Sequence, residues 1–349
     1  MMKSSKRALA LLVITALVMI CLTGCQKSTP TATQITGERT VTDMAGRTVK
    51  LPAEIKTIAT FGSIGVLNAF VETMGEGSKI CNEMSPSFTK KDTWKYQYVF
   101  APQIKNGPVF EDASRAIQME KVLQAKPDLC LSMDKATVDL LAAQGLNVIY
   151  ISWDKPEDVK TCITLLGDAL NKKDVAADYL AWFDKTVARA QDLTKNLKEQ
   201  DKKKVVYGSV STLTQPHLIA EWWIPAAGGI SVTDNGRTAQ SLTYTMEDLL
   251  QWNPDVMILS DKAIEKDVFA EARLANISAM KNQQVFIVPC VAHVWGNRTP
   301  EQPLTILWTI NKLYPQLETT EALKQDISYF YSHFFKINLT DDQLQEIIG

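Results

Sequence analysis

The chain has 349 residues, of which 46% are hydrophobic and 22% are charged, with 16 glycines and 14 prolines, and this composition excludes an intrinsically disordered or polytopic membrane protein. Its formal net charge is −2, and removal of an N-terminal segment holding three basic residues leaves 34 basic against 39 acidic residues, so nucleic acid is not an expected partner. The length exceeds the size at which a single core usually keeps growing, so we expect two domains.

Residues 1–24 are predicted to be a lipoprotein signal peptide. Three basic residues precede the apolar run "ALALLVITALVMICLTG", which stops at Cys25 and is typical of a secretory signal. The run is also about long enough for a membrane anchor, which is the alternative. The four residues "LTGC" resemble the lipobox of bacterial lipoproteins, in which the cysteine is acylated, so Cys25 is the predicted lipidation site. Residues 25–38 are polar and are predicted to form a flexible tether.

Residues 39–171 are predicted to form a first α/β lobe. A hairpin is expected in "RTVTDMAGRTVKLP", and the strand "IKTIAT" leads into a helix after "FGS". Apolar residues at helical spacing predict a helix over 116–125, which Pro127 and Asp128 end before the strand "LCLSM". The helix "TVDLLAAQG" and the strand "NVIYIS" follow. This alternation indicates a parallel sheet with helices on both faces.

Residues 172–202 are predicted to form an inter-lobe helix. No glycine or proline interrupts Lys172 to Lys204, and apolar residues recur every three to five positions. A helix from Lys172 to Gln200 would span roughly 40 Å at 1.5 Å per residue, enough to bridge two domains as a stiff rod. An amphipathic helix packed on one lobe is the alternative, and periodicity alone does not exclude it.

Residues 203–349 are predicted to form a second α/β lobe that repeats the pattern of the first. The segments "MEKVLQAKPDLCLS", from Met119, and "MEDLLQWNPDVMILS", from Met246, share Met, Glu, Leu, Gln, Pro and Asp in register. This pair indicates equivalent helix–strand units in two similar halves. A chance resemblance between two common helix-Pro-Asp-strand patterns is the alternative.

Motifs of catalysis are absent from the sequence. It contains no H-E-x-x-H, G-x-S-x-G, Walker or G-x-G-x-x-G pattern, and "SMDK" matches S-x-x-K without its companion elements. The three histidines, His217, His293 and His333, are far apart in sequence, which gives little support for a multi-histidine metal site. We therefore expect a protein that is not an enzyme and has no resident metal or cofactor. A metal-dependent extracytoplasmic hydrolase is the alternative.

Aromatic and polar residues gather where loops are expected to face a cleft. Trp222 and Trp223 precede the segment "AAGG", and His293, Trp295 and Arg298 follow the strand "VFIVP". Ligands of open parallel sheets bind beyond the carboxyl ends of the strands. A tryptophan would supply a flat apolar wall, and the arginine a forked cation for an anionic group. The alternative is that one of the paired tryptophans packs in the core and the arginine pairs with the nearby glutamate.

From about Arg39 onward the chain resembles the substrate-binding lipoproteins of ABC importers for iron-siderophores, cobalamin and haem. The resemblance rests on the lipobox, "DMAGRTVKLP", the repeated E-x-[VL]-L-x-x-x-P-D pattern, "AAGG", and "WGNRTPEQPLTILWTINKLYP". It implies the helical-backbone periplasmic binding protein fold, an α/β architecture of two Rossmann-like lobes with parallel sheets joined by one long α-helix. The ligand would lie between the lobes, with modest hinge motion.

The resemblance also implies how the chain meets its transporter. The glutamate of each repeated pattern, Glu120 and Glu247, would dock onto arginines of the permease dimer. Both are also suitable first-turn helix residues that favour the helix dipole, and the two roles are compatible. The implied partners are an ABC permease dimer with its ATPase, a metal-chelate ligand, and the cell membrane through the lipid anchor, with the receptor itself acting as a monomer.

The resemblance implies further ligand contacts in the first lobe, from the first strand end, from an aromatic residue before the first repeat, and from the loop 81–100. Aromatic residues of that loop would line the mouth of the site or pack as an Ω-loop. These first-lobe candidates are Phe61, Ser63, Trp94, Tyr96 and Phe110. The expected ligand is a metal chelate, a ferric siderophore first, with a corrinoid or haem as open alternatives. An oxyanion or a bare metal would need fewer aromatic residues and ranks lower.

Overall fold

The computed structural model describes residues 39–62 and 64–349. The predicted signal peptide, lipidation site Cys25 and tether, and the candidate ligand residue Ser63, lie outside the described residues. Over the described ranges, no helix has both the length and the apolar character needed to span a membrane. Residues 38–349 form one compact unit.

The first lobe is built on a parallel three-stranded sheet in the order β3-β4-β5. Its strands are β3 (Ile58–Phe61), β4 (Leu129–Ser132) and β5 (Val148–Tyr150). All residues of β3 and β4 are buried, as expected of strands covered on both faces. An antiparallel hairpin of β1 (Arg39–Thr42) and β2 (Thr48–Leu51) precedes the sheet, which confirms the predicted hairpin.

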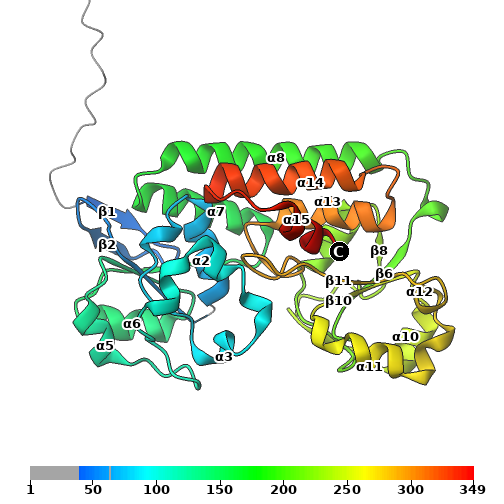
Figure 1. Cartoon of the computed structure of the whole chain (residues 1–349), viewed down its shortest axis with the longest axis horizontal. Helices are drawn as coiled ribbons and strands as arrows, with labels where there is room; N and C mark the ends of the chain where they lie inside the picture. Colours follow the sequence, from blue (N-terminus) through cyan, green and yellow to red (C-terminus); the bar gives the residue numbers. More distant parts are fainter. Residues whose placement is uncertain (1–38, 63) are drawn as a thin grey trace, which may run out of the picture. The chain divides into compact units, whose positions relative to one another are not determined.

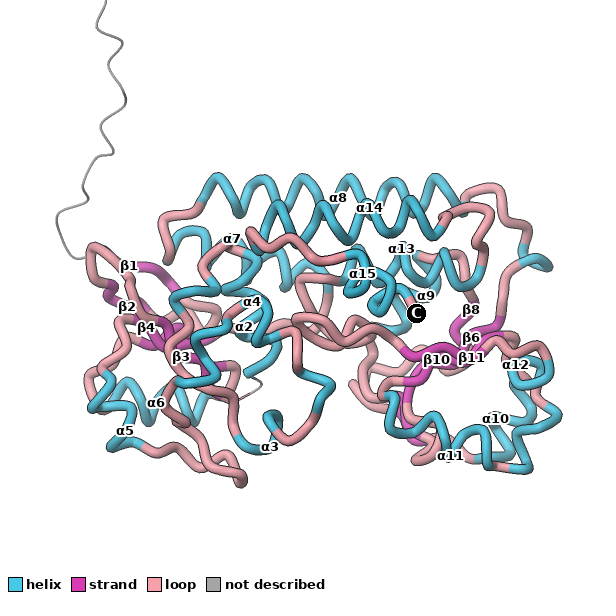
Figure 2. Tube along the Cα trace, viewed as in Figure 1, coloured by secondary structure: helices cyan, strands magenta, loops and turns pink. Residues whose placement is uncertain are grey.

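Helices cover this sheet, as Figures 1 and 2 show. The helices of the first lobe are α2 (Ile64–Thr73), α3 (Pro86–Thr89), α4 (Gln97–Phe100), α5 (Met119–Ala125), α6 (Lys135–Ala143) and α7 (Pro156–Ala169). The helix predicted over 116–125 begins at Met119. The preceding residues turn instead, because the Asp112 carboxylate accepts hydrogen bonds from the backbone N–H groups of Ser114 and Ala116.

The second lobe is built on a parallel four-stranded sheet in the order β11-β10-β6-β8. Its strands are β6 (Lys204–Gly208), β8 (Ile230–Ser231), β10 (Val256–Leu259) and β11 (Val285–Ile287), and a separate antiparallel pair is formed by β7 (Thr214–Gln215) and β9 (Leu242–Thr243). The helices that follow α8 are α9 (Ala220–Ala226), α10 (Met246–Trp252), α11 (Glu265–Ala270), α12 (Ser278–Lys281), α13 (Gln302–Leu313), α14 (Thr320–Phe330) and α15 (Asp341–Ile348).

One long helix, α8 (Lys173–Thr194), connects the two lobes (Figure 1). Its 22 residues span about 33 Å. It packs on α7 of the first lobe and on α9 and α13 of the second. The helix ends at Thr194, before the predicted Gln200. The predicted fold, two parallel α/β lobes joined by one long helix, is confirmed.

The repeated segments fold into matching units. Helices α5 and α10 each end at a residue in the left-handed conformation, Lys126 (φ 47°) and Asn253 (φ 43°). The aspartate that follows each Pro ties the unit to the neighbouring strand. Asp128 Oδ2 accepts from the backbone N–H of Thr57 at 3.0 Å, and Asp255 Oδ2 from that of Lys204 at 2.9 Å. The repeat therefore encodes the start of the central parallel pairing in both lobes.

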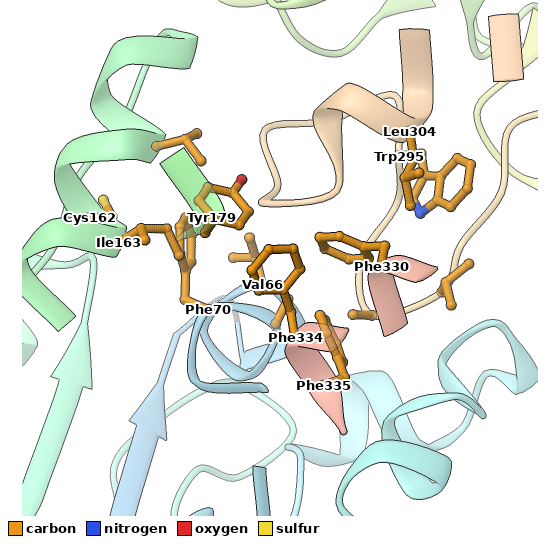
Figure 3. Close-up of a cluster of buried hydrophobic side chains, with 14 of the residues drawn as sticks. Val66, Phe70, Cys162, Ile163, Tyr179, Trp295, Leu304, Phe330, Phe334 and Phe335 are labelled. Carbon is orange, nitrogen blue, oxygen red and sulfur yellow. The ribbon is translucent and has the colours of Figure 1, made fainter. Parts of the chain in front are cut away.

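The C-terminal elements return to the first lobe. After α14 the chain forms a π-helical turn, η7 (Tyr331–Phe335), which packs on α2. Figure 3 shows Phe330, Phe334 and Phe335 gathered with Phe70 and Tyr179 in a cluster that draws on both halves of the chain. One hydrophobic core therefore continues from one lobe into the other. The predicted domain boundaries stay a prediction.

Candidate functional site

The two lobes meet through an aromatic stack between Trp94 and His293. The ring centroids lie 5.3 Å apart with an interplanar angle of 28°. Trp94 follows α3 in the first lobe, and His293 follows β11 in the second. The stack lies beyond the carboxyl end of β11, where ligands of open parallel sheets bind. Trp94 is buried and His293 is half-buried, so the stack is a packing contact between the two lobes.

The His293 loop, defined here as residues 290–298, is held by hydrogen bonds to the buried carboxylate of Glu301. Burial raises the pKa of Glu301, and the hydrogen bonds that its carboxylate accepts oppose that shift. Each donor is a backbone N–H, an indole N–H or a hydroxyl group. The donors are Ala292 N, His293 N, Trp295 Nε1, Thr299 Oγ1 and Tyr331 OH. The loop is thereby a fixed platform for the His293 imidazole.

Close backbone approach also fixes the His293 loop. A Cβ atom on Gly296 would lie 2.3 Å from the Tyr207 ring, so only glycine lets the loop lie against β6. The Tyr207 hydroxyl donates to Asn297 Oδ1 at 3.1 Å, and the Trp223 indole N–H donates to the Gly296 carbonyl at 3.2 Å. The loop is therefore anchored on the second sheet as well as on Glu301.

Arg298 makes a second contact between the two lobes. Its guanidinium donates to the backbone carbonyl of Trp153 at 2.6 Å and forms an ion pair with Asp154 of the first lobe. The Trp153 indole N–H donates back to the Arg298 carbonyl at 3.2 Å. The side chain of Arg298 is 16% exposed and that of Asp154 is 67% exposed. Arg298 therefore pairs with Asp154 of the first lobe and not with Glu301, whose carboxylate accepts hydrogen bonds from other groups.

The charge of Arg298 acts on both His217 and His293, and that of His217 acts on His293. Burial, with the charge of Arg298, lowers the pKa of His217 to about 4. Burial, with the charges of His217 and Arg298, lowers the pKa of His293 to about 3. The Nδ1 atoms of both rings are buried and have no hydrogen-bond partner. Both imidazoles are therefore neutral at pH 7, and the Nδ1 atom of each has no partner in the protein.

Several predicted ligand residues lie in the core. Trp223 and Trp295 are fully buried, and the half-buried Trp222 stacks on Phe183 of α8. Phe61 and Phe110 are fully buried and stack on each other, with centroids 5.9 Å apart. Tyr96 is buried and its hydroxyl donates to the Gln343 carbonyl. A predicted direct contact between these six residues and a ligand stays a prediction, and their observed role is packing.

A groove of about 680 Å³ adjoins the site. It is lined by Thr93, Lys95 and Tyr96 of the first lobe and by Cys290 and Val291 of the second. The groove is also lined by residues of β11, of α13 and of the C-terminus, and neither Trp94 nor His293 is part of its lining. Its volume is within the range of small-molecule sites. A second hollow, of about 300 Å³, lies beside α10 and α11.

The candidate docking carboxylates, Glu120 and Glu247, are both exposed. Each occupies the first turn of its helix, α5 or α10. Figure 1 places both helices on the side of the compact unit away from α8. Two exposed negative charges on one side, one from each lobe, satisfy the geometric condition for docking, and the docking itself stays a prediction.

Sequence reasoning missed His217, Trp153 and Gln97. His217 was visible only as one of three scattered histidines, and nothing local marks it as a neighbour of His293. Trp153 immediately follows the predicted strand "NVIYIS", so its place at a strand end was an available signal. Gln97 carries no sequence signal, because the partners of a buried amide come from distant segments.

Comparison with known proteins identifies the family. The profile described as "Periplasmic binding protein" matches residues 84–291, and the chain belongs to this family. A periplasmic solute-binding protein from Veillonella parvula superposes with a TM-score of 0.76 at 24% identity, over 89% of this chain and 97% of that one. The iron(3+)-hydroxamate-binding protein YxeB of Bacillus subtilis is 22% identical over 281 residues, 78% of this chain and 74% of YxeB.

The molybdate-binding protein MolA of Haemophilus influenzae is 30% identical over 101 residues, 28% of this chain and 29% of MolA. That sequence match therefore spans under a third of either protein. The structure of MolA bound to molybdate superposes with a TM-score of 0.74 at 19% identity, over 86% of this chain and 99% of that one.

These matches confirm that the chain is a solute-binding protein, as predicted. The hydrolase alternative gains no support from them. Across residues 39–62 and 64–349, no group of three or more His, Cys, Asp or Glu side chains could hold a metal ion. The candidate site consists of the two imidazoles and Arg298.

Proposed function

We propose that this protein is the extracytoplasmic receptor of an ABC importer and that it binds a metal chelate between its lobes. The observation that carries the proposal is the pair of neutral imidazoles, His217 and His293, whose buried Nδ1 atoms have no protein partner. Imidazole nitrogen is a common metal ligand in proteins, and two nitrogens alone hold a bare ion poorly. The preferred cargo is therefore a chelate that leaves open positions on its metal.

Charge and shape support this ligand class. Arg298 provides a cation near the imidazoles that would attract a chelate of net negative charge, such as a ferric catecholate, and gives no such support to a ferric hydroxamate, which is neutral or positive. The groove of about 680 Å³, lined by residues next to Trp94 in the chain, offers room for the ligand periphery. A ferric hydroxamate is the first candidate, since the relative YxeB is named for such a ligand. Corrinoids and haem, whose metals also accept imidazole, follow.

A second candidate ligand is an oxyanion such as molybdate. The observation that favours it is the similarity to MolA, whose structure holds molybdate. Arg298 would supply charge, and the imidazole N–H groups would donate hydrogen bonds. The groove of about 680 Å³ would then have no ligand to contact, so this candidate ranks below the chelate.

The proposal includes delivery and anchoring. The lipobox supports acylation of Cys25 and attachment to the outer face of a membrane. Exposed Glu120 and Glu247 would dock onto a two-fold permease, one carboxylate from each lobe. The receptor would act as a monomer, because one copy supplies both carboxylates.

Binding titrations test the proposal. The soluble chain is titrated with ferric bis-hydroxamates, cobalamin, haem and molybdate, and intrinsic tryptophan fluorescence is followed. We expect a Kd below about 10 μM for at least one metal chelate. Tight binding of molybdate together with no response to any chelate would replace the first candidate by the second. Absence of binding to the whole panel would contradict both.

A further inference from the structure

A chain of buried polar side chains runs from the first sheet to the His293 loop. Thr60 Oγ1 donates to Asn68 Oδ1 at 2.8 Å, and Asn68 Nδ2 donates to Gln97 Oε1 at 2.8 Å. Gln97 Nε2 then donates to the carbonyl oxygen of Ala292 at 2.6 Å. All four residues have no exposed surface. The chain crosses the lobe boundary, because Thr60 lies in β3 and Ala292 follows β11.

The backbone at Ala292 and His293 is also held by hydrogen bonds within the second lobe. The backbone N–H groups of Ala292 and His293 donate to the two carboxylate oxygens of Glu301, at 3.0 and 2.8 Å. Gln97 therefore fixes the carbonyl of Ala292 from the first lobe, while Glu301 fixes the adjoining amides from the second. Breaking these hydrogen bonds would cost free energy, because no water replaces the lost partner of a buried polar group.

Gln97 also fixes the ring on which His293 stacks. Its Nε2 atom donates to the carbonyl of Gly65 at 3.3 Å. A Cβ atom on Gly65 would lie only 2.6 Å from the Trp94 indole, so this glycine lets Trp94 lie directly on α2. Through Gly65 and Ala292, one amide group sets the positions of both Trp94 and His293.

We propose that Gln97 is a positioning residue of the ligand site. It holds the His293 loop against the first lobe, so that the orientation of the imidazole depends on the separation of the lobes. Gln97 reaches no ligand itself, and it acts through the backbone of Ala292. The effect on ligand affinity rests on the proposed function, whereas the effect on the loop does not.

The test compares Gln97→Met with Gln103→Met. The first substitution keeps the length of the side chain and removes its hydrogen bonds to both lobes. Gln103 is a matched control, because its Nε2 atom also donates to two backbone carbonyls of the first lobe, those of Gly77 and Ile80, each at 2.9 Å. Gln97→Glu, which keeps an acceptor for Asn68, serves as a second variant should Gln97→Met fail to fold.

The first readout is amide hydrogen exchange of the ligand-free protein. We expect the Ala292 and His293 amides to exchange at least about tenfold faster in Gln97→Met than in the wild type, and to be unchanged in Gln103→Met. Equal protection of these amides in the wild type and Gln97→Met, or equal loss in both variants, would overturn the inference. This readout needs no ligand.

The second readout is affinity for a ferric bis-hydroxamate probe. We expect Gln97→Met to weaken binding about tenfold and Gln103→Met to leave it unchanged. Unchanged affinity in Gln97→Met would overturn the positioning role. If the wild type binds no probe while the exchange rates change as expected, the positioning of the loop stands and the proposed ligand class falls.

Discussion

The indole of Trp94 stacks on the imidazole of His293 although the two residues belong to lobes whose sheets share no strand. The stack desolvates the imidazole and thereby contributes to the lowered pKa of His293. A neutral imidazole with a free lone pair is what a metal requires of a ligand. The same contact therefore joins the two lobes and helps to keep the His293 imidazole neutral.

Alanine substitution of the two cleft histidines is expected to remove chelate binding. His217→Ala and His293→Ala should each raise the Kd for a ferric bis-hydroxamate at least about tenfold, because each deletes one metal ligand. His333→Ala is the control, since that ring is paired with Asp178 and stacks on Tyr329. Isothermal titration measures all three. Equal affinity of the cleft variants and the control would contradict the assignment.

The lowered pKa values predict how binding depends on pH. Protons compete with the metal for imidazole only as the pH falls toward the pKa values of His217, about 4, and His293, about 3. Affinity for an acid-stable chelate should therefore stay constant from about pH 8 to pH 6 and fall below about pH 5. A decline that begins already near pH 7 would indicate histidines of ordinary pKa.

The Arg298–Asp154 pair predicts opposite effects of two substitutions. Arg298→Ala removes the cation and should weaken binding of an anionic chelate about tenfold. Asp154→Asn removes the carboxylate that competes for the guanidinium, so it should strengthen binding severalfold. The affinity of the same chelate is measured at low and high salt. A loss of affinity in both variants would show that the pair acts by joining the lobes and not by its charge.

Two buried glutamates predict opposite pH dependences of stability. Burial raises the pKa of Glu72 well above its ordinary value, and its carboxyl oxygens have no hydrogen-bond partner. Glu72 thus stays protonated in the folded state while the unfolded chain ionises, so it lowers stability increasingly as the pH rises above the ordinary pKa of glutamate. Glu72→Gln should therefore gain stability relative to wild type from pH 5 to pH 8.

Glu76 is the matched opposite case. Burial acts to raise its pKa, but ion pairs with Lys172 and Lys79, both at 2.8 Å, lower it overall. Its contribution to stability is present above the ordinary pKa of glutamate and is lost as the pH falls through its lowered value. Glu76→Gln should destabilise the protein at pH 7 and have little effect at low pH. Urea unfolding of both variants across pH checks the two signs together.

Charge reversal at the two exposed glutamates separates binding from delivery. Glu120→Lys with Glu247→Lys should leave ligand affinity unchanged and abolish uptake in a reconstituted transporter, because like charges would face the permease arginines. Glu321→Lys is the control, since Glu321 is also an exposed first-turn residue, on α14 beside α8. Normal uptake by the double variant would exclude the docking role.

Local patterns were sufficient to predict most of the fold. The repeated Glu, Pro and Asp predicted two equivalent helix–strand units, and both form with the same left-handed cap and the same aspartate bonds to a neighbouring strand. The helix and its left-handed cap depend on residues a few positions apart, which is the range that a sequence pattern reports, whereas the aspartate bonds join residues 71 and 51 positions apart. The early end of α8 shows the limit of periodicity alone, because Leu197 continues the helical spacing of apolar residues and yet lies beyond the end of the helix at Thr194.

The site was less predictable, because its contacts join distant segments. Trp295 and His293 are two residues apart and equally plausible as ligand contacts, yet the Trp295 indole lies in the core and donates to Glu301, whereas the His293 imidazole stacks on Trp94 of the first lobe. Arg298 pairs with a residue 144 positions away. No local signal distinguishes these outcomes, since each depends on which side of the His293 loop faces Glu301.

X-ray absorption at the metal edge of a bound ferric bis-hydroxamate tests the central claim most directly. Wild-type protein is compared with free chelate and with the His217→Ala, His293→Ala double variant. We expect the multiple scattering of imidazole ligands in the wild-type complex and its absence from the other two spectra. A wild-type spectrum identical to that of the free chelate would show that neither imidazole reaches the metal, and would contradict the proposed site.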